Sequence, residues 1–324
     1  MPQDASLSLG DPVVWKAACG VIGQRLHDQP SIKSSQSSGA LVSIGLPVRN
    51  GAKTLERVVR SVLAQDYEPV ELVVSDNAST DDTEALCRDL AVADDRIVYH
   101  RQPTNIGLLG NFIQTMKLAK GSFFRWVGDD DWLAPTCISR CMDAFVEDSC
   151  LILVTTQLEY IRPDGSKYTS PCVDSTFRSS DPIERFERYI SHLIDGSLPV
   201  DPLYGVARRA SLLTIARRNT MREDEVFAGK LALAGPWGHV PEVLGARFVR
   251  NYGLPELARF LGVPIWQAYL PTSVQCWEML RGLRTEGITR SQLRRARLAV
   301  GRLYVLRHYR ELLRRTRKLT EKMA

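Results

Sequence analysis

Three consecutive aspartates, Asp129, Asp130 and Asp131, directly follow an apolar run in the stretch FRWVGDDDWLAP. Neighbouring carboxylates repel one another and are costly to remove from water, so a packed element seldom contains three of them. Carboxylates on one short loop suit a hard divalent cation such as Mg²⁺ or Mn²⁺, which often shares its coordination with substrate phosphates. A solvated loop in which Asp131 caps the next helix is the alternative interpretation. The stretch alone leaves both interpretations open.

A second polar pair, Asp76 and Asn77, follows the apolar run VELVVS. A carboxylate beside an amide can bind the polar edge of a nucleobase or the hydroxyls of a ribose. The alternative is a helix cap, in which Ser79 or Thr80 begins the following helix. The two roles are compatible, because a cap needs only one of these side chains.

Alternating strands and helices are expected to position these residues. Apolar, β-branched runs predict strands and amphipathic stretches predict helices. The strands are expected at 40–48, 70–79, 96–102 and 122–128, and the helices at 49–65, 80–92 and 107–121. Such alternation indicates a parallel sheet that is covered on both faces.

Ligands of parallel sheets bind beyond the carboxyl ends of the strands. Polar residues gather at three of these ends, namely Arg49 and Asn50 after the first strand, the Asp76 pair after the second, and the aspartates after the fourth. Three loops are therefore expected to meet in one crevice.

The pattern is weaker beyond residue 151. A strand at 151–156, a helix at 182–194 and short strands or turns at 203–212 and 239–248 are expected. No GxGxxG motif follows a strand, which argues against a dinucleotide-binding fingerprint.

The composition is that of a soluble globular protein, with 44% hydrophobic and 24% charged residues among 324. No apolar run reaches the length of a membrane-spanning helix, and the N-terminal region lacks the pattern of a secretory signal. The seven cysteines show no CxxC pair or zinc-like spacing, so we expect reduced thiols. The predicted location is cytoplasmic, either free or peripheral at the cytoplasmic face of the membrane.

The net charge of +5 is unevenly distributed. Residues 281–324 contain fourteen Lys and Arg against three Glu, whereas the first 280 residues have a net charge of −6. The apolar residues Ala299, Leu303, Leu306, Tyr309 and Leu313 recur at helical spacing in this tail. Three interpretations follow: a solvated helix that packs one face on the body, a basic amphipathic helix on an anionic membrane, or a nucleic-acid-binding helix. The acidic body and the lack of a recognition module argue against nucleic acid.

The segment from Leu41 to about Ala144 resembles the opening of the family 2 glycosyltransferases. The stretches VSIGLPVRNGAKTLERVVRSVLAQ, VELVVSDNASTDD, TNIGLLGNF and GSFFRWVGDDDWLAP carry the resemblance in order. The resemblance implies an α/β fold of the GT-A type, with a Rossmann-like, mostly parallel sheet, helices on both faces and, here, a basic helical C-terminal extension. The expected division is a flexible segment at 1–40, a nucleotide-sugar-binding half at 41–150, an acceptor-side half at 151–250 and the extension at 251–324.

The resemblance also implies an activity, namely inverting transfer of a hexose from a nucleoside-diphosphate sugar to an acceptor hydroxyl with help from Mn²⁺ or Mg²⁺. The expected acceptor is a glycan or a lipid-linked molecule, as in the synthesis of cell-envelope polysaccharides or glycolipids. Two rival classes are a nucleotidyltransferase and a non-catalytic homologue that binds a sugar nucleotide or a glycan. The loop PVRNGAK has a single glycine, which argues against the nucleotidyltransferase.

Site residues are carried over from the family motifs position by position. The metal is expected at Asp129, Asp130 and Asp131. The usual DxDD reads GDDD here, with Gly128 in first place, so the motif leaves open which aspartate binds the metal directly; Asp130, supported by its neighbours, is favoured. An aromatic residue is frequent in the family at the position of Arg49. The expected nucleotide-sugar contacts are Pro47, Arg49, Asn50, Asp76, Asn77, Asn105, Gly107, Asn111, Asp129 and Asp130.

The stretch MREDEVFAGKLALAG resembles the acceptor-side segment of the family, in which a carboxylate at a helix start is the general base. The alignment assigns this role to Asp224, with Glu223 as the substitute. An ordinary acidic first turn is the alternative, because carboxylates favour a helix N-terminus.

Overall fold

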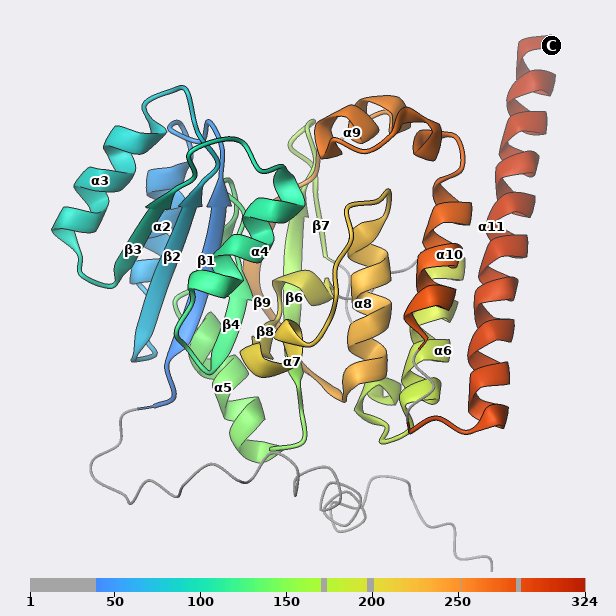
Figure 1. Cartoon of the computed structure of the whole chain (residues 1–324), viewed down its shortest axis with the longest axis horizontal. Helices are drawn as coiled ribbons and strands as arrows, with labels where there is room; N and C mark the ends of the chain where they lie inside the picture. Colours follow the sequence, from blue (N-terminus) through green and yellow to red (C-terminus); the bar gives the residue numbers. More distant parts are fainter. Residues whose placement is uncertain (1–38, 170–173, 197–200, 251, 284–286, 324) are drawn as a thin grey trace, which may run out of the picture. The chain divides into compact units, whose positions relative to one another are not determined.

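A nine-stranded sheet forms the centre of the fold, in the order β3-β2-β1-β4-β8-β6-β9-β5 with β7 paired to β6 (Figure 1). The computed structural model describes residues 39–169, 174–196, 201–250, 252–283 and 287–323. The strands are β1 (Val42–Val48), β2 (Val70–Asp76), β3 (Ile97–Arg101), β4 (Phe123–Trp126), β5 (Trp132–Leu133), β6 (Leu153–Ile161), β7 (Lys167–Thr169), β8 (Val206–Arg208) and β9 (Trp237–Phe248). The helices are α2 (Leu55–Leu63), α3 (Thr83–Ala93), α4 (Leu108–Leu118), α5 (Cys137–Glu147), α6 (Pro182–Asp195), α7 (Arg209–Leu213), α8 (Glu223–Ala234), α9 (Leu254–Leu261), α10 (Pro271–Gly282) and α11 (Arg290–Met323), with 3₁₀ turns η1 (Ser175–Arg178), η2 (Pro202–Tyr204) and η3 (Ile265–Ala268).

The first four strands are parallel, which confirms the expected alternation of strands and helices. Every residue of β1 and β2 is buried, as expected for strands that are covered on both faces. One apolar core lies under α2 and α5, and a second lies on the opposite face under α4, α6 and α8. The GT-A-like fold class predicted from the sequence is therefore present.

The second half mixes strand directions. β8 is antiparallel to β4 and β6, while β9 runs parallel to β6 and curves along it with irregular register. The strand predicted at 151–156 extends to Ile161, and the helix predicted at 182–194 is α6. The segment 203–212 forms η2, β8 and α7, and the segment 239–248 lies within β9.

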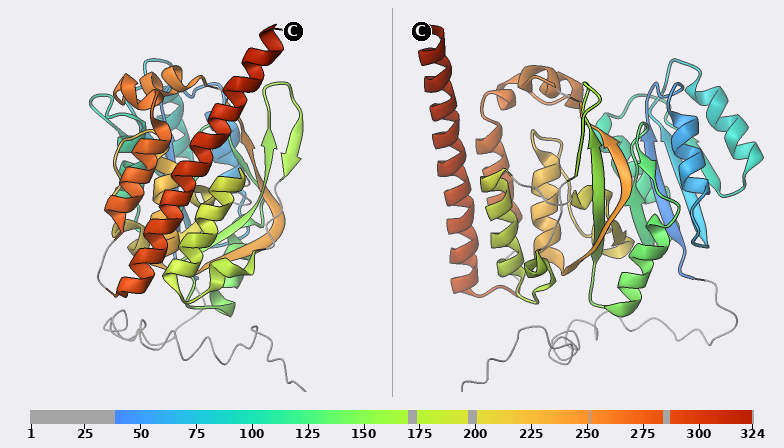
Figure 2. Two further views of the ribbon diagram at one scale, coloured as in Figure 1. Left: turned by 90° about the vertical axis from the view of Figure 1, so that its right-hand side faces the viewer. Right: turned by 180° about the vertical axis from the view of Figure 1, so that it is seen from behind.

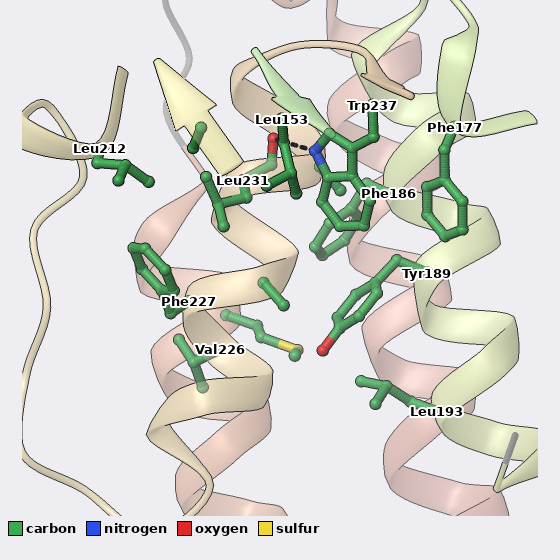
Figure 3. Close-up of a cluster of buried hydrophobic side chains, with 14 of the residues drawn as sticks. Leu153, Phe177, Phe186, Tyr189, Leu193, Leu212, Val226, Phe227, Leu231 and Trp237 are labelled. Atoms are coloured by element: carbon green, nitrogen blue, oxygen red, sulfur yellow. Dashed lines mark hydrogen bonds between the residues drawn. The ribbon is translucent and has the colours of Figure 1, made fainter. Parts of the chain in front are cut away.

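The core between α6, α8 and the sheet fixes the position of the α8 N-terminus (Figure 3). Trp237 is buried against this helix and donates its indole N–H to the Leu231 carbonyl at 3.3 Å. Tyr189 of α6 donates its hydroxyl hydrogen to the Glu225 carbonyl in the first turn of α8 at 2.9 Å. Tyr189 thus holds the first turn of α8 from the neighbouring helix α6, while Trp237 holds α8 nearer its C-terminal end.

The predicted C-terminal helical extension is also present, as α10 and α11 (Figure 2). α11 packs on α6 and α10 and buries Ala296, Val300 and Leu303. One face of the basic helix thus packs on the body, which is the first of the three interpretations of the tail.

The cysteines depart in part from the expectation of reduced thiols. Cys87, Cys137, Cys141 and Cys276 are free and buried. Cys150, in contrast, is disulfide-bonded.

Asn111 of α4 connects the carboxyl ends of two strands. Its amide N–H₂ donates to the carbonyls of Ser75 at 2.8 Å and Val48 at 3.3 Å, and its oxygen accepts from the Ser75 hydroxyl at 2.7 Å. The side chain is buried, so these bonds have little competition from water. Asn111 thus stabilises the edge from which two of the candidate loops begin.

We predict that Asn111→Ala lowers the free energy of unfolding by about 1–3 kcal/mol, because buried polar groups lose their partners. Denaturant unfolding followed by fluorescence measures the change. Lys117→Ala, at an exposed position of the same helix, is the control and should leave stability almost unchanged. Equal stability of the two variants would contradict the assigned role.

Candidate active site

The loops after β1, β2 and β4 meet at the carboxyl edge of the sheet, as predicted. The Asn50 amide donates to the Ser79 hydroxyl at 2.9 Å, and the Thr80 amide donates to the Asn50 side chain at 2.8 Å. On its other side the first loop approaches the aspartates, since a Cβ at Gly51 would lie 3.2 Å from Asp129 Oδ2. Asn50 itself has a positive φ of 56°, a conformation that asparagine tolerates better than most residues. The β1 loop therefore connects the other two.

Asp76 is buried and has its carboxylate bonded inside the protein. Oδ1 accepts from the Ser79 amide at 2.9 Å, and Oδ2 accepts from the Tyr99 hydroxyl at 3.0 Å. The Arg101 guanidinium lies 3.6 Å away and compensates the charge. In this structure Asp76 shapes the loop at 77–81 and does not face solvent.

The predicted asparagine motif is organised around Asn77. Its side chain donates to Asn105 Oδ1 at 2.8 Å and to the Gly107 carbonyl at 3.2 Å, and it accepts from the Ile106 amide at 2.8 Å. Asn77 is buried, whereas Asn105 is exposed. The motif thus fixes the loop before α4 and leaves Asn105 at the surface.

The residues predicted at the end of β1 also divide into buried and exposed ones. Pro47 is buried within β1, whereas Arg49 and Asn50 are exposed at its end. Among the described residues, Arg49 forms no hydrogen bond or ion pair, so its guanidinium is available to a ligand.

Asp131 differs from Asp129 and Asp130 in its burial and in its bonding partners. The side chain is 4% exposed and accepts a hydrogen bond from the Gly128 amide at 2.7 Å. A Cβ at position 128 would lie 2.9 Å from Asp131 Oδ2, so a larger residue there would have to displace the Asp131 carboxylate. Glycine at this position, where the family motif usually has an acidic residue, is compatible with the bond between Asp131 and the Gly128 amide.

Asp129 and Asp130 point toward one cation, Arg250, which follows β9. The Arg250 Nη2 atom lies 2.6 Å from Asp130 Oδ2 and 3.8 Å from Asp129 Oδ1. Burial, and next the charge of Asp130, raise the pKa of Asp129 to about 6, while Arg250 opposes the shift. The two carboxylates thus converge on a position where positive charge is favourable.

These two residues fit a divalent cation that completes its coordination with a diphosphate. Mg²⁺ is usually held by one or two carboxylates together with substrate phosphates. The described residues contain no group of three or more acidic, histidine or cysteine side chains that could hold a metal alone. Asp129 and Asp130 are therefore the metal candidates, with Asp131 turned away.

Arg247 of β9 connects the aspartate loop with the second half of the fold. Its Nε lies 3.6 Å from Asp131 Oδ1, and the guanidinium also pairs with Asp201. The same group stacks on Tyr204, 3.5 Å from the ring centroid. Sequence reasoning missed Arg247, Arg250 and Asp201. The available signal for Arg247 was its place as a charged residue in the predicted segment 239–248, and Arg250 and Asp201 lie outside that segment.

The α8 N-terminus distinguishes Asp224 from its acidic neighbours. Glu223 makes two bonds to the buried Arg217, at 2.7 and 2.5 Å. Glu225 pairs with Arg307 at 2.8 Å and accepts from Gln275 at 2.7 Å. Asp224 forms no ion pair within the described parts of the chain.

The surroundings of Asp224 also raise the pKa of its carboxyl group, as suits a general base. Asp224 is exposed at the start of α8, and desolvation by the protein around it is the first cause that raises its pKa to about 6. The charge of Glu225 comes next, and Asp201 adds to the shift while the Glu225 amide opposes it. Asp201 in turn pairs with Arg247, whose guanidinium also faces Asp131 of the aspartate loop.

Comparison with known proteins identifies the family of the chain. The family model described as "Glycosyl transferase family 2" matches residues 43–211. A chondroitin synthase of Pasteurella multocida is 31% identical over 126 residues, which are 39% of this chain and 13% of that protein. A GalNAc(5)-diNAcBac-PP-undecaprenol beta-1,3-glucosyltransferase of Campylobacter jejuni is 34% identical over 118 residues, 34% of this chain and 38% of that one. The chain thus spans well under two thirds of either relative.

Two solved structures share the fold. Residues 1–349 of TarS from S. aureus superpose with a TM-score of 0.56 at 16% identity, over 81% of this chain and 71% of that one. The mannosyltransferase PcManGT from Pyrobaculum calidifontis, in complex with GDP-Man and Mn²⁺, gives 0.50 at 15% identity, over 90% of this chain and 96% of that one. At these identities the likeness concerns the fold alone.

We predict that Arg250→Gln strengthens Mn²⁺ binding to the nucleotide-free protein about fivefold, because a half-exposed guanidinium and the metal compete for the same carboxylates. Titration calorimetry or the Mn²⁺ EPR signal measures the affinity. Arg259→Gln, at an exposed position of α9, is the matched control. Unchanged or weaker Mn²⁺ binding in the Arg250 variant would show that Asp129 and Asp130 are not the metal ligands.

Proposed function

Because this chain belongs to glycosyltransferase family 2, we propose that it transfers a sugar from a nucleoside-diphosphate donor to an acceptor hydroxyl. The observation that carries the proposal is Asp224, an exposed carboxylate at the start of α8 that has a pKa of about 6 and no ion pair with another described residue. A carboxylate in this state is suited to accept a proton near neutral pH.

The donor is proposed to bind at the carboxyl edge of β1 and β2. Arg49, Asn50 and Asn105 offer exposed polar groups there, and Asp76, Asn77 and Asn111 hold the backbone that carries them. The TarS structure in complex with UDP-GlcNAc and the mannosyltransferase with GDP-Man are folds of the same type with nucleotide sugars bound. They support a nucleotide sugar as the donor class.

Asp129 and Asp130 are proposed to hold a divalent cation, Mn²⁺ or Mg²⁺, together with the donor. A cation bound there supplies positive charge that offsets the charge on the departing diphosphate. Behind them, Asp131 and Arg247 hold the loop in place through the Gly128 amide and Asp201.

Asp224 is proposed to take the proton of the acceptor hydroxyl while that oxygen attacks the anomeric carbon. The new carbon–oxygen bond forms as the bond to the diphosphate breaks, so the electron pair leaves with the diphosphate and the configuration inverts. Glu223 supports this arrangement through Arg217 and does not act as the base. The chondroitin synthase and the undecaprenol-linked glucosyltransferase among the relatives favour a glycan or lipid-linked acceptor.

A thermal-shift panel of UDP, GDP, dTDP and CDP, each with Mn²⁺, Mg²⁺ or EDTA, tests the donor site. Binding at a hundredfold excess over Kd stabilises the folded state by about 2.7 kcal/mol, so one nucleotide should raise Tm and EDTA should remove the increase. Asp130→Asn should lose this response. Asp89→Asn, the same change at an exposed position of α3, should keep it. No response to any nucleotide would contradict the donor site.

We predict that Asp224→Asn lowers sugar transfer about 10²–10⁴-fold, the usual value of general-base catalysis, while the nucleotide thermal shift persists. In the wild type, kcat should fall as the pH drops below about 6, because protonation of Asp224 removes the base. Release of nucleoside diphosphate in the presence of acceptor measures both effects. Asp89→Asn again serves as the control. Near-normal turnover of the Asp224 variant would remove its assignment as the base.

A further inference from the structure

α11 carries two apolar stripes on opposite sides. The inner stripe contains Ala296, Val300 and Leu303, which are 0%, 1% and 0% exposed. Leu298, Val305 and Tyr309 are 64%, 60% and 57% exposed. Their spacing of seven and four residues places these three on one line of a helix, opposite the inner stripe. An ordinary surface helix needs only the first stripe, so the second one requires another explanation.

Arginines flank this second stripe. Arg294 and Arg302 are exposed and lie close to the line of Leu298 and Val305. Within the described part of the chain neither forms an ion pair, whereas Arg295 and Arg307 of the same helix pair with Glu187 and Glu225. We call Arg294, Leu298, Arg302, Val305 and Tyr309 the outer face of α11. In Figure 2, left, this helix runs diagonally across the front of the molecule, and its C-terminal end projects beyond the other elements.

We propose that the outer face of α11 docks the protein on an anionic lipid surface. A helix that combines an apolar stripe with arginines lies in the plane of a membrane interface, with the apolar side chains inserted and the cations at the headgroups. Residues 281–324 add to the attraction with fourteen basic against three acidic residues. The attachment is peripheral, because none of the described helices is long and apolar enough to cross a membrane.

Charge complementarity favours an anionic lipid surface over a second copy of the chain as the partner of the outer face. A two-fold contact through the outer face would bring Arg294 and Arg302 of both copies together without acidic partners, and unpaired charges in an interface are costly. A lipid surface with phosphate headgroups supplies the missing negative charge. The inference deepens the proposed function, because a lipid-linked acceptor would be presented at such a surface.

Co-sedimentation of the full chain with vesicles tests the proposal. The probes are vesicles of phosphatidylcholine alone and vesicles that also contain phosphatidylglycerol. We expect binding only to the anionic vesicles, about fivefold weaker for each arginine removed in Arg294→Gln and Arg302→Gln, and roughly tenfold weaker in Val305→Asp. Val146→Asp is the matched control, because Val146 is 84% exposed on α5, away from α11. Thermal unfolding of each variant confirms that the fold is retained.

Binding that is absent, independent of anionic lipid, or equally strong in the Val305 and Val146 variants would overturn the proposal. A wild-type dimer that dissociates only in Val305→Asp, measured by light scattering without vesicles, would overturn it in favour of self-association. The assay contains neither donor nor acceptor. Failure of vesicle binding and failure of sugar transfer are therefore distinguishable results.

Discussion

The pairing of arginines with carboxylates at the carboxyl edge of the sheet is the constraint on which the candidate site depends. A carboxylate that is buried away from water needs a cation or hydrogen-bond donors beside it, because its ionised form is otherwise unfavourable. Arg247 satisfies Asp131 and Asp201, while Arg217 satisfies Glu223. Each such pair fixes a loop or a helix start in one orientation.

The same pairing determines which carboxylates remain available for chemistry. Asp129 has only a 3.8 Å ion pair with Arg250, and Asp224 has none among the described residues; both have a pKa raised to about 6, mainly by burial. Asp131, Arg247 and Asp201, in contrast, form a chain of paired charges. The proposed function, in which Asp129 helps to hold a cation and Asp224 accepts a proton, makes use of this difference between satisfied and unsatisfied groups.

The sequence predicted the first half of the fold well and the roles within the site less well, for a physical reason. Buried parallel strands and amphipathic helices leave local patterns, so β1 to β4 and the convergence of their loops could be predicted. Ion-pair partners leave no local pattern, because Arg250 lies 120 residues from Asp130 and was recognised only from the structure. The sequence likewise could not show that Asp76 and Asn111, expected at the nucleotide, are buried in hydrogen bonds that build the pocket edge.

α11 connects the surface of the protein with the candidate base. Its inner side reaches the start of α8, where Arg307 pairs with Glu225 at 2.8 Å and donates to Gln275 of α10 at 2.7 Å. Gln275 in turn donates to Glu225, so three helices meet beside Asp224. Because Glu225 is held from α11, the orientation of the first turn of α8 depends on how α11 packs. The basic extension thus helps to position the candidate base, and an interaction on its outer face would act on a helix that contacts the candidate site.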